Sequence, residues 1–126
     1  MGLKESIESR GALIGIIGMG YVGLPLALEA AGAGFRVIGL EKDGEKRERL
    51  ARGEALYEGL DGDRLKELLA AGKFEVSGDA AVLASCDVIC VCVPTPLSRT
   101  RDPDLGFIRE AAAQIRDALR LSLIHI

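Results

Sequence analysis

The chain has 126 residues, of which 48% are apolar, and this is enough to build the core of a single domain. Its formal net charge of −3 argues against nucleic acid and anionic membrane surfaces as binding partners. No stretch reaches the roughly 20 apolar residues of a membrane-spanning helix, and the polar N-terminus of mixed charge does not resemble a signal peptide.

The first regular pattern is an apolar strand that leads directly into a glycine-rich turn and a helix. Residues 13–17 are apolar on both faces, as in a central parallel strand. The pattern G-x-G-x-x-G follows, with its glycines at Gly18, Gly20 and Gly23, and a helix is predicted over residues 22–31. This strand–turn–helix context makes the glycine pattern a dinucleotide-binding fingerprint rather than a turn without a ligand.

The three glycines have different predicted roles. Gly18 allows a tight turn, Gly20 allows a pyrophosphate to approach the backbone closely, and Gly23 allows the helix to pack tightly on the strand. Phosphates are favoured at such a helix N-terminus because free N–H groups and the positive end of the helix dipole face them.

A second strand, predicted over residues 35–40, ends next to an acidic residue. Glu41 lies roughly 20 residues beyond the glycines, where this fold places the acid that binds the adenosine ribose. Its carboxylate would accept hydrogen bonds from the ribose hydroxyls and repel a 2′-phosphate, which favours NAD over NADP. The alternative is a solvated loop carboxylate, and Lys42, Lys46 and Arg47 could weaken the preference for NAD.

The remaining chain continues to alternate helices and strands. Helices are predicted over 44–52, 61–71, 79–84 and 105–120, and strands over 74–77 and 87–93. The last helix should be capped by Asp104, and its predicted inner stripe is Ile108, Ala112, Ile115 and Leu119. This order predicts the α/β class: a Rossmann-like, doubly wound parallel sheet of about four strands, incomplete, with its cofactor at the carboxyl ends of the strands.

Several side chains are expected to border that crevice. Pro94 and Thr95 follow the fourth strand, and the Thr95 hydroxyl could reach a phosphate or the nicotinamide side, or could merely stabilise a turn. Tyr21 is expected at the crevice wall rather than in proton transfer.

The three cysteines are expected to be packing residues. Cys86, Cys90 and Cys92 lie beside or within the fourth predicted strand, and their spacing does not match a common zinc site. Their odd number favours a reducing cytoplasm over a disulfide framework. We therefore expect no metal site, and we expect none of the three to be a nucleophile.

Two motifs carry a more specific resemblance. The run Gly-Met-Gly-Tyr-Val-Gly-Leu-Pro-Leu-Ala at residues 18–27 resembles the opening of the UDP-glucose/GDP-mannose dehydrogenase family. The run Val-Pro-Thr-Pro-Leu at 93–97, with Pro-Asp-Leu at 103–105 and the lead-in at 7–12, is similar to the branch that oxidises UDP-N-acetylglucosamine or UDP-N-acetylmannosamine. The likeness runs from about residue 3 to residue 120.

The resemblance implies an NAD-dependent oxidation of the C6 hydroxyl of a nucleotide sugar to a carboxylate. Two NAD are reduced in turn, through an aldehyde and a thioester on a catalytic Cys, and the product feeds surface polysaccharide synthesis. Within the family, the chain most resembles the UDP-N-acetylglucosamine 6-dehydrogenase branch, which implies a UDP-sugar substrate and a homo-oligomer. The alternatives are a UDP-glucose 6-dehydrogenase, another Rossmann dehydrogenase and a stand-alone nucleotide-binding module without catalysis.

The resemblance also implies a set of cofactor-binding residues. Glu41 stands where the family usually has Asp, Lys46 matches a basic residue on the adenosine side, and Thr95 matches a cofactor-contacting threonine. The expected set is Gly18, Gly20, Tyr21, Val22, Gly23, Glu41, Lys46, Pro94 and Thr95.

The domain organisation expected from the resemblance is incomplete. Residues 1–120 would form the NAD-binding Rossmann domain at the N-terminal end of a larger enzyme, and no catalytic residue is expected among them. The family's next strand, with its Ser-Thr-Thr signature, should follow residue 120, so residues 121–126 are interpreted as a non-native or truncated tail.

Overall fold

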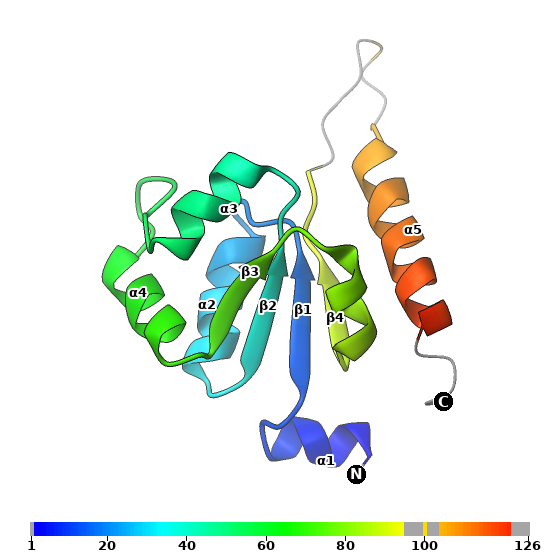
Figure 1. Ribbon diagram of the computed structural model, residues 1–126, viewed down its shortest axis with the longest axis horizontal. Coiled ribbons are helices and arrows are strands. Elements are labelled where there is room, and N and C mark those ends of the chain that lie inside the picture. The colour runs from blue at the N-terminus through cyan, green and yellow to red at the C-terminus, as the bar shows by residue number, and fades with distance from the viewer. Residues whose placement is uncertain (1, 95–99, 101–103, 122–126) are drawn as a thin grey trace.

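The computed structural model describes residues 2–94, 100 and 104–121, with side chains through residue 119. Helices and strands alternate along the chain, except that two helices lie between the second and third strands (Figure 1). In order, the elements are α1 (Leu3–Glu8), β1 (Leu13–Ile17), α2 (Gly23–Gly32), β2 (Arg36–Leu40), α3 (Gly44–Ala51), α4 (Gly62–Ala70), β3 (Phe74–Ser77), the 3₁₀ helix η1 (Ala80–Ser85), β4 (Val88–Val91) and α5 (Gly106–Leu121).

The four strands form one parallel sheet in the order β3-β2-β1-β4. β1 is central, and its Ile16 lies between Gly39 of β2 and Cys90 of β4. This confirms the predicted α/β class and, within the part of the chain that the structure describes, the number of strands. The chain leaves β1 toward β2 on one side, and β4 lies on the other side, so the strand order reverses at β1.

Helices cover both faces of the sheet, and each face has its own apolar cluster (Figure 1). The first cluster joins β1 to α2, α3 and α4, with Ile16, Leu24 and Leu50 all fully buried. The second joins β1 to η1 and α5, with Ile17 and Leu83 buried. Ile16 and Ile17 are adjacent in β1 and serve opposite faces, because successive side chains of a strand alternate.

Aspartates begin three of the helical segments and position their first turns. Asp43, Asp61 and Asp79 precede α3, α4 and η1, and each side chain accepts a hydrogen bond from a backbone N–H in the turn that follows. Asp104 accepts from the backbone N–H of Gly106 at 2.9 Å, as predicted for the start of α5.

The predicted helices and strands all occur, within one residue at each end, except that β4 ends two residues early. Its backbone pairing nevertheless extends further, because Asp87 N donates to Leu13 O and Cys92 N donates to Ile17 O, both at 2.8 Å. The additional helix α1 was not predicted. It buries none of its residues, so its sequence shows no apolar stripe that could have revealed it.

The predicted inner stripe of the last helix is confirmed at Ile115 and wrong at its other three positions, including the exposed Ala112. Ile108 and Leu119 are exposed, whereas Ala111 and Ala118 are buried and Ile115 packs beside them. The reason is that α5 packs mainly against η1, and a helix can approach this segment closely only through small side chains. The two buried alanines therefore face inward, and Ile108 and Leu119 are turned outward.

The three cysteines are free and half-buried, as their packing role predicts. Cys90 and Cys92 pack against the cluster under α2, while Cys86 packs against the cluster under η1.

The burial of α2 generates a first prediction. Leu24 is completely buried and should cost about 2–5 kcal/mol of unfolding free energy when changed to Ala, because the cavity cannot close fully. Leu26, on the same helix, is 41% exposed, and Leu26→Ala should cost no more than about 1 kcal/mol. Urea unfolding measures both variants, and equal losses would contradict this assignment of the buried face.

Candidate functional site

The turn between β1 and α2 is enclosed by the ends of the two neighbouring strands. Gly18 has a φ of +100°, which side-chain-bearing residues rarely adopt, and its N–H donates to Leu40 O of β2 at 3.0 Å. A Cβ added at Gly18 would lie 2.6 Å from the Cys92 carbonyl oxygen, just past β4. The turn can therefore pass between β2 and β4 only if this residue is glycine.

The other two glycines of the motif have opposite surroundings. A Cβ at Gly23 would overlap the carbonyl oxygen of Gly18, so the first residue of α2 packs backbone to backbone on the turn. A Cβ at Gly20 would meet no atom within 4 Å. Gly18 and Gly23 thus have the turn and packing roles predicted for them, while Gly20 faces open space.

A cavity of about 460 Å³ lies above this turn, at the carboxyl ends of β1, β2 and β4. It lies where the strand order reverses at β1, which is where open α/β sheets bind their ligands. The predicted residues that line it are Gly18, Gly20, Tyr21, Val22, Glu41, Lys46 and Pro94. Gly23 is buried beneath the turn instead, and Thr95 lies outside the described residues.

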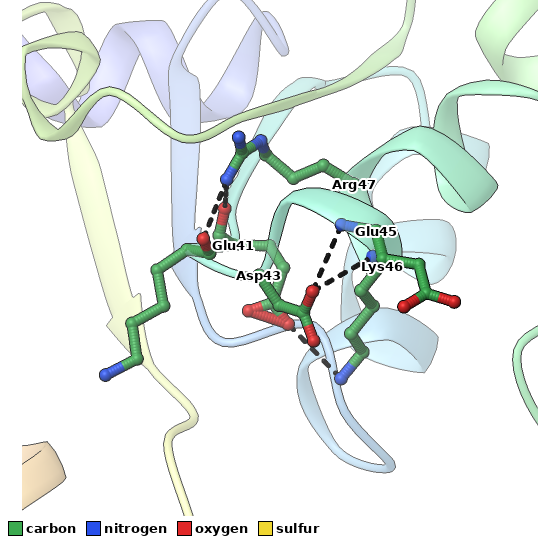
Figure 2. Close-up of polar contacts among 6 residues, drawn as sticks. Glu41, Asp43, Glu45, Lys46 and Arg47 are labelled. Atoms are coloured by element: carbon green, nitrogen blue, oxygen red, sulfur yellow. Dashed lines mark hydrogen bonds and ion pairs between the residues drawn. The ribbon is translucent and has the colours of Figure 1, made fainter.

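Glu41 is held in place at the end of β2 through both its backbone and its side chain (Figure 2). Its N–H donates to Ser77 O at 2.9 Å, and its carbonyl oxygen accepts from Arg47 Nη1 at 2.9 Å. Its carboxylate lies 3.2 Å from Lys46 Nζ, and the Glu41 side chain is only 12% exposed. A solvated loop carboxylate would not have these constraints.

The start of α3 supplies the basic residues that surround Glu41. Asp43 Oδ1 accepts from the N–H groups of Glu45 at 3.1 Å and Lys46 at 3.4 Å, which fixes the first turn of the helix (Figure 2). From this turn, Lys46 reaches the carboxylate and Arg47 reaches the strand-end carbonyls.

Tyr21, at one wall of the cavity, packs against a second aromatic ring. The ring centroids of Tyr21 and Tyr57 are 4.7 Å apart, and the ring planes are tilted by 50°. Burial, and to a smaller extent Tyr21, raises the pKa of Tyr57, so its hydroxyl stays protonated at neutral pH. Among the described residues, the buried Tyr57 hydroxyl oxygen has no hydrogen-bond partner. Tyr21 is 79% exposed and lines the cavity, as predicted for a wall residue.

The sequence matches the family model described as "UDP-glucose/GDP-mannose dehydrogenase family, NAD binding domain" over residues 12–125. The chain belongs to this family. NAD is therefore the cofactor of the domain. The matched range includes residues 121–125 of the segment predicted to be a non-native or truncated tail.

Individual relatives have more specific names. The chain is 35% identical to a UDP-N-acetyl-D-mannosamine dehydrogenase of Pyrococcus horikoshii, over 84% of this chain and 25% of the relative. It is 32% identical to a UDP-N-acetyl-D-glucosamine 6-dehydrogenase of Pseudomonas aeruginosa, over 85% of this chain and 24% of the relative. The chain thus spans about a quarter of the length of these relatives.

Solved structures of the family have the same fold. A ternary complex of GDP-mannose dehydrogenase from Pseudomonas aeruginosa superimposes with a TM-score of 0.80 at 30% identity, and the match covers 85% of this chain and 25% of that one. The Rossmann-like class predicted from the sequence is confirmed by this agreement.

Several residues that line the cavity were not predicted as site residues. They are contributed by the end of β3 and by α5, and they include Gly78, Phe107, Glu110, Ala111 and Gln114. The available signal was topological: a helix that follows β4 must begin at the carboxyl edge, so its first turns border the crevice.

Cys92 also lines the cavity, but its chemistry does not suit a nucleophile. Burial, and secondarily Cys90, raises the pKa of the Cys92 thiol, which keeps it from forming the reactive thiolate. In the described ranges, no cluster of His, Cys, Asp or Glu could hold a metal ion. No helix of the described part is long and apolar enough to span a membrane.

The contrast between Gly20 and Gly23 generates a second prediction. Gly23→Ala should lower the unfolding free energy by about 1–3 kcal/mol or more, because the new methyl group overlaps the Gly18 carbonyl. Gly20→Ala has room for its methyl group and should change stability by no more than about 1 kcal/mol. Thermal unfolding of the two variants would contradict this geometry if Gly20→Ala were the more damaging change.

Proposed function

We propose that the cavity holds NAD, with its diphosphate over the turn at Gly20 and its adenosine ribose at Glu41. The observation that carries this proposal is the difference among the glycines: Gly18 and Gly23 are closed in by backbone atoms, whereas Gly20 is open toward the cavity. A turn without a ligand gives no reason for a glycine at an open position. The proposed cofactor residues are Gly18, Gly20, Tyr21, Val22, Gly23, Glu41, Lys46, Pro94 and Thr95.

Each group would bind one part of the cofactor. The N-terminus of α2 would bind the diphosphate through its free N–H groups and dipole. The Glu41 carboxylate would accept hydrogen bonds from the ribose hydroxyls, and its ion pair with Lys46 would orient that carboxylate. Bound NAD supplies the hydride acceptor, and this part of the protein binds and orients it.

We further propose that the complete protein is a UDP-N-acetylhexosamine 6-dehydrogenase. It would oxidise the C6 hydroxyl of its UDP-sugar to a carboxylate, reducing two NAD, for surface polysaccharide synthesis. The names of two relatives support this substrate class, since the mannosamine and glucosamine sugars differ only in configuration at C2. Within this class we propose the glucosamine form, which is the substrate in the name of the Pseudomonas aeruginosa relative. The catalytic cysteine would lie outside residues 1–126, and the complete enzyme would be a homo-oligomer. Three free cysteines favour the cytoplasm as its compartment.

A substrate panel tests this proposal. The protein expressed from the complete gene would be incubated with NAD and, separately, UDP-N-acetylglucosamine, UDP-N-acetylmannosamine, UDP-glucose and GDP-mannose. We expect two NADH per sugar and a carboxylate product, identified by mass spectrometry, with a UDP-N-acetylhexosamine and most efficiently with the glucosamine form. Turnover of only UDP-glucose or GDP-mannose would replace the proposed substrate class, and NAD binding without any turnover would favour a binding module.

A substitution at Gly20 tests the cofactor site separately. Gly20→Val places a branched side chain where the diphosphate would lie, so we expect NAD affinity to fall by at least about 100-fold, the effect of losing several charge-assisted hydrogen bonds. Calorimetric titration measures the affinity, and circular dichroism serves as the folding control. A folded variant that binds NAD as well as the unchanged protein does would contradict the placement of the diphosphate.

A further inference from the structure

Three basic residues follow Glu41 at the proposed adenosine end of the cavity. Lys42, Lys46 and Arg47 all lie within six residues of Glu41, and a basic side chain near this acid is what accommodates the 2′-phosphate of NADP in the same fold. The partners of these three side chains therefore decide how attractive this end of the cavity is to a phosphate.

Two of the three basic side chains are bound within their own segment. Lys46 Nζ lies 3.2 Å from the Glu41 carboxylate. Arg47 Nη1 donates to the carbonyl oxygens of Glu41 and Lys42, each at 2.9 Å (Figure 2). The Arg47 guanidinium also fills the space beside Gly78, where an added Cβ would lie 2.5 Å from Arg47 Cζ. Both cations are therefore committed to holding Glu41 in place.

Lys42 is bound differently, by a residue far away in the sequence. Its Nζ lies 2.9 Å from Glu110 Oε2 of α5 and 5.2 Å from the centroid of the Phe107 ring. Lys42, Phe107 and Glu110 all line the cavity. The Lys42 ammonium is thus paired with α5, although its backbone directly follows Glu41.

We propose that Glu110 is a specificity-determining residue that disfavours NADP, and this proposal rests on the NAD site proposed above. Glu110 would act in two ways: it pairs with the Lys42 ammonium, which could otherwise bind a 2′-phosphate, and it adds a second negative charge to that of Glu41. Selection of NAD would then depend on two acids from distant elements, one at the end of β2 and one on α5.

The Lys42–Glu110 pair is suited to a clean test because it contributes little to folding. The two side chains are 62% and 46% exposed, and ion pairs at such positions add little to stability. Glu110→Gln keeps the size and polarity of the side chain and removes only its charge. Glu67→Gln is a matched control, because Glu67 is an exposed acid on α4 that does not line the cavity.

The experiment measures dissociation constants of NAD and NADP for the complete protein by calorimetry. In Glu110→Gln we expect NADP to bind about fivefold more tightly, the upper end for an exposed charge pair, and NAD affinity to change less than about twofold. NADP should still bind more weakly than NAD, because Glu41 remains. Glu67→Gln should change neither affinity, and Lys42→Met combined with Glu110→Gln should abolish most of the gain.

The possible results separate this inference from the proposal on which it rests. If the unchanged protein binds NAD and Glu110→Gln leaves the ratio of the two affinities unaltered, the role of Glu110 is overturned while the NAD site stands. If the gain for NADP persists without Lys42, the pairing with Lys42 is overturned. If the unchanged protein binds neither cofactor, the NAD site itself fails, and the role of Glu110 fails with it.

Discussion

The site depends on close backbone packing at Gly18, whose carbonyl lies directly against Gly23 and whose Cα lies against the Cys92 carbonyl. This packing brings the end of β1, the start of α2 and the end of β4 closer together than any side chain would allow. It places the N-terminus of α2 beside the carboxyl edge of the sheet, where the cavity opens. Without it, the turn would move into the space that we assign to the diphosphate.

The rest of the cavity is organised around that turn by side chains from three other segments. Arg47 and Lys46 hold Glu41 at the end of β2, and Asp43 fixes the helix turn from which they extend. On the opposite face, α5 brings Glu110 to Lys42 across the edge of the sheet. The site thus has a floor of backbone and a rim of charged pairs.

Much of this arrangement could be predicted because the relevant signals are local. β1 is apolar on both faces, and the spacing of the glycines identified the turn, so the strand, the motif and the position of Glu41 followed from short-range pattern. The buried face of α5 could not be predicted in this way, because the helix has apolar residues on more than one face. Only its packing against η1 selects Ala111 and Ala118 for burial over Ile108 and Leu119. The pairing of Lys42 with Glu110 spans 68 positions in the sequence and depends on that same packing.

A crystal structure of the complete protein with bound NAD tests the central claim most directly, because it locates every part of the cofactor at once. We predict that the diphosphate lies over Gly20 at the N-terminus of α2, with the ribose hydroxyls hydrogen-bonded to the Glu41 carboxylate. NAD bound elsewhere on the domain, or in this cavity with its ribose remote from Glu41, would contradict the account.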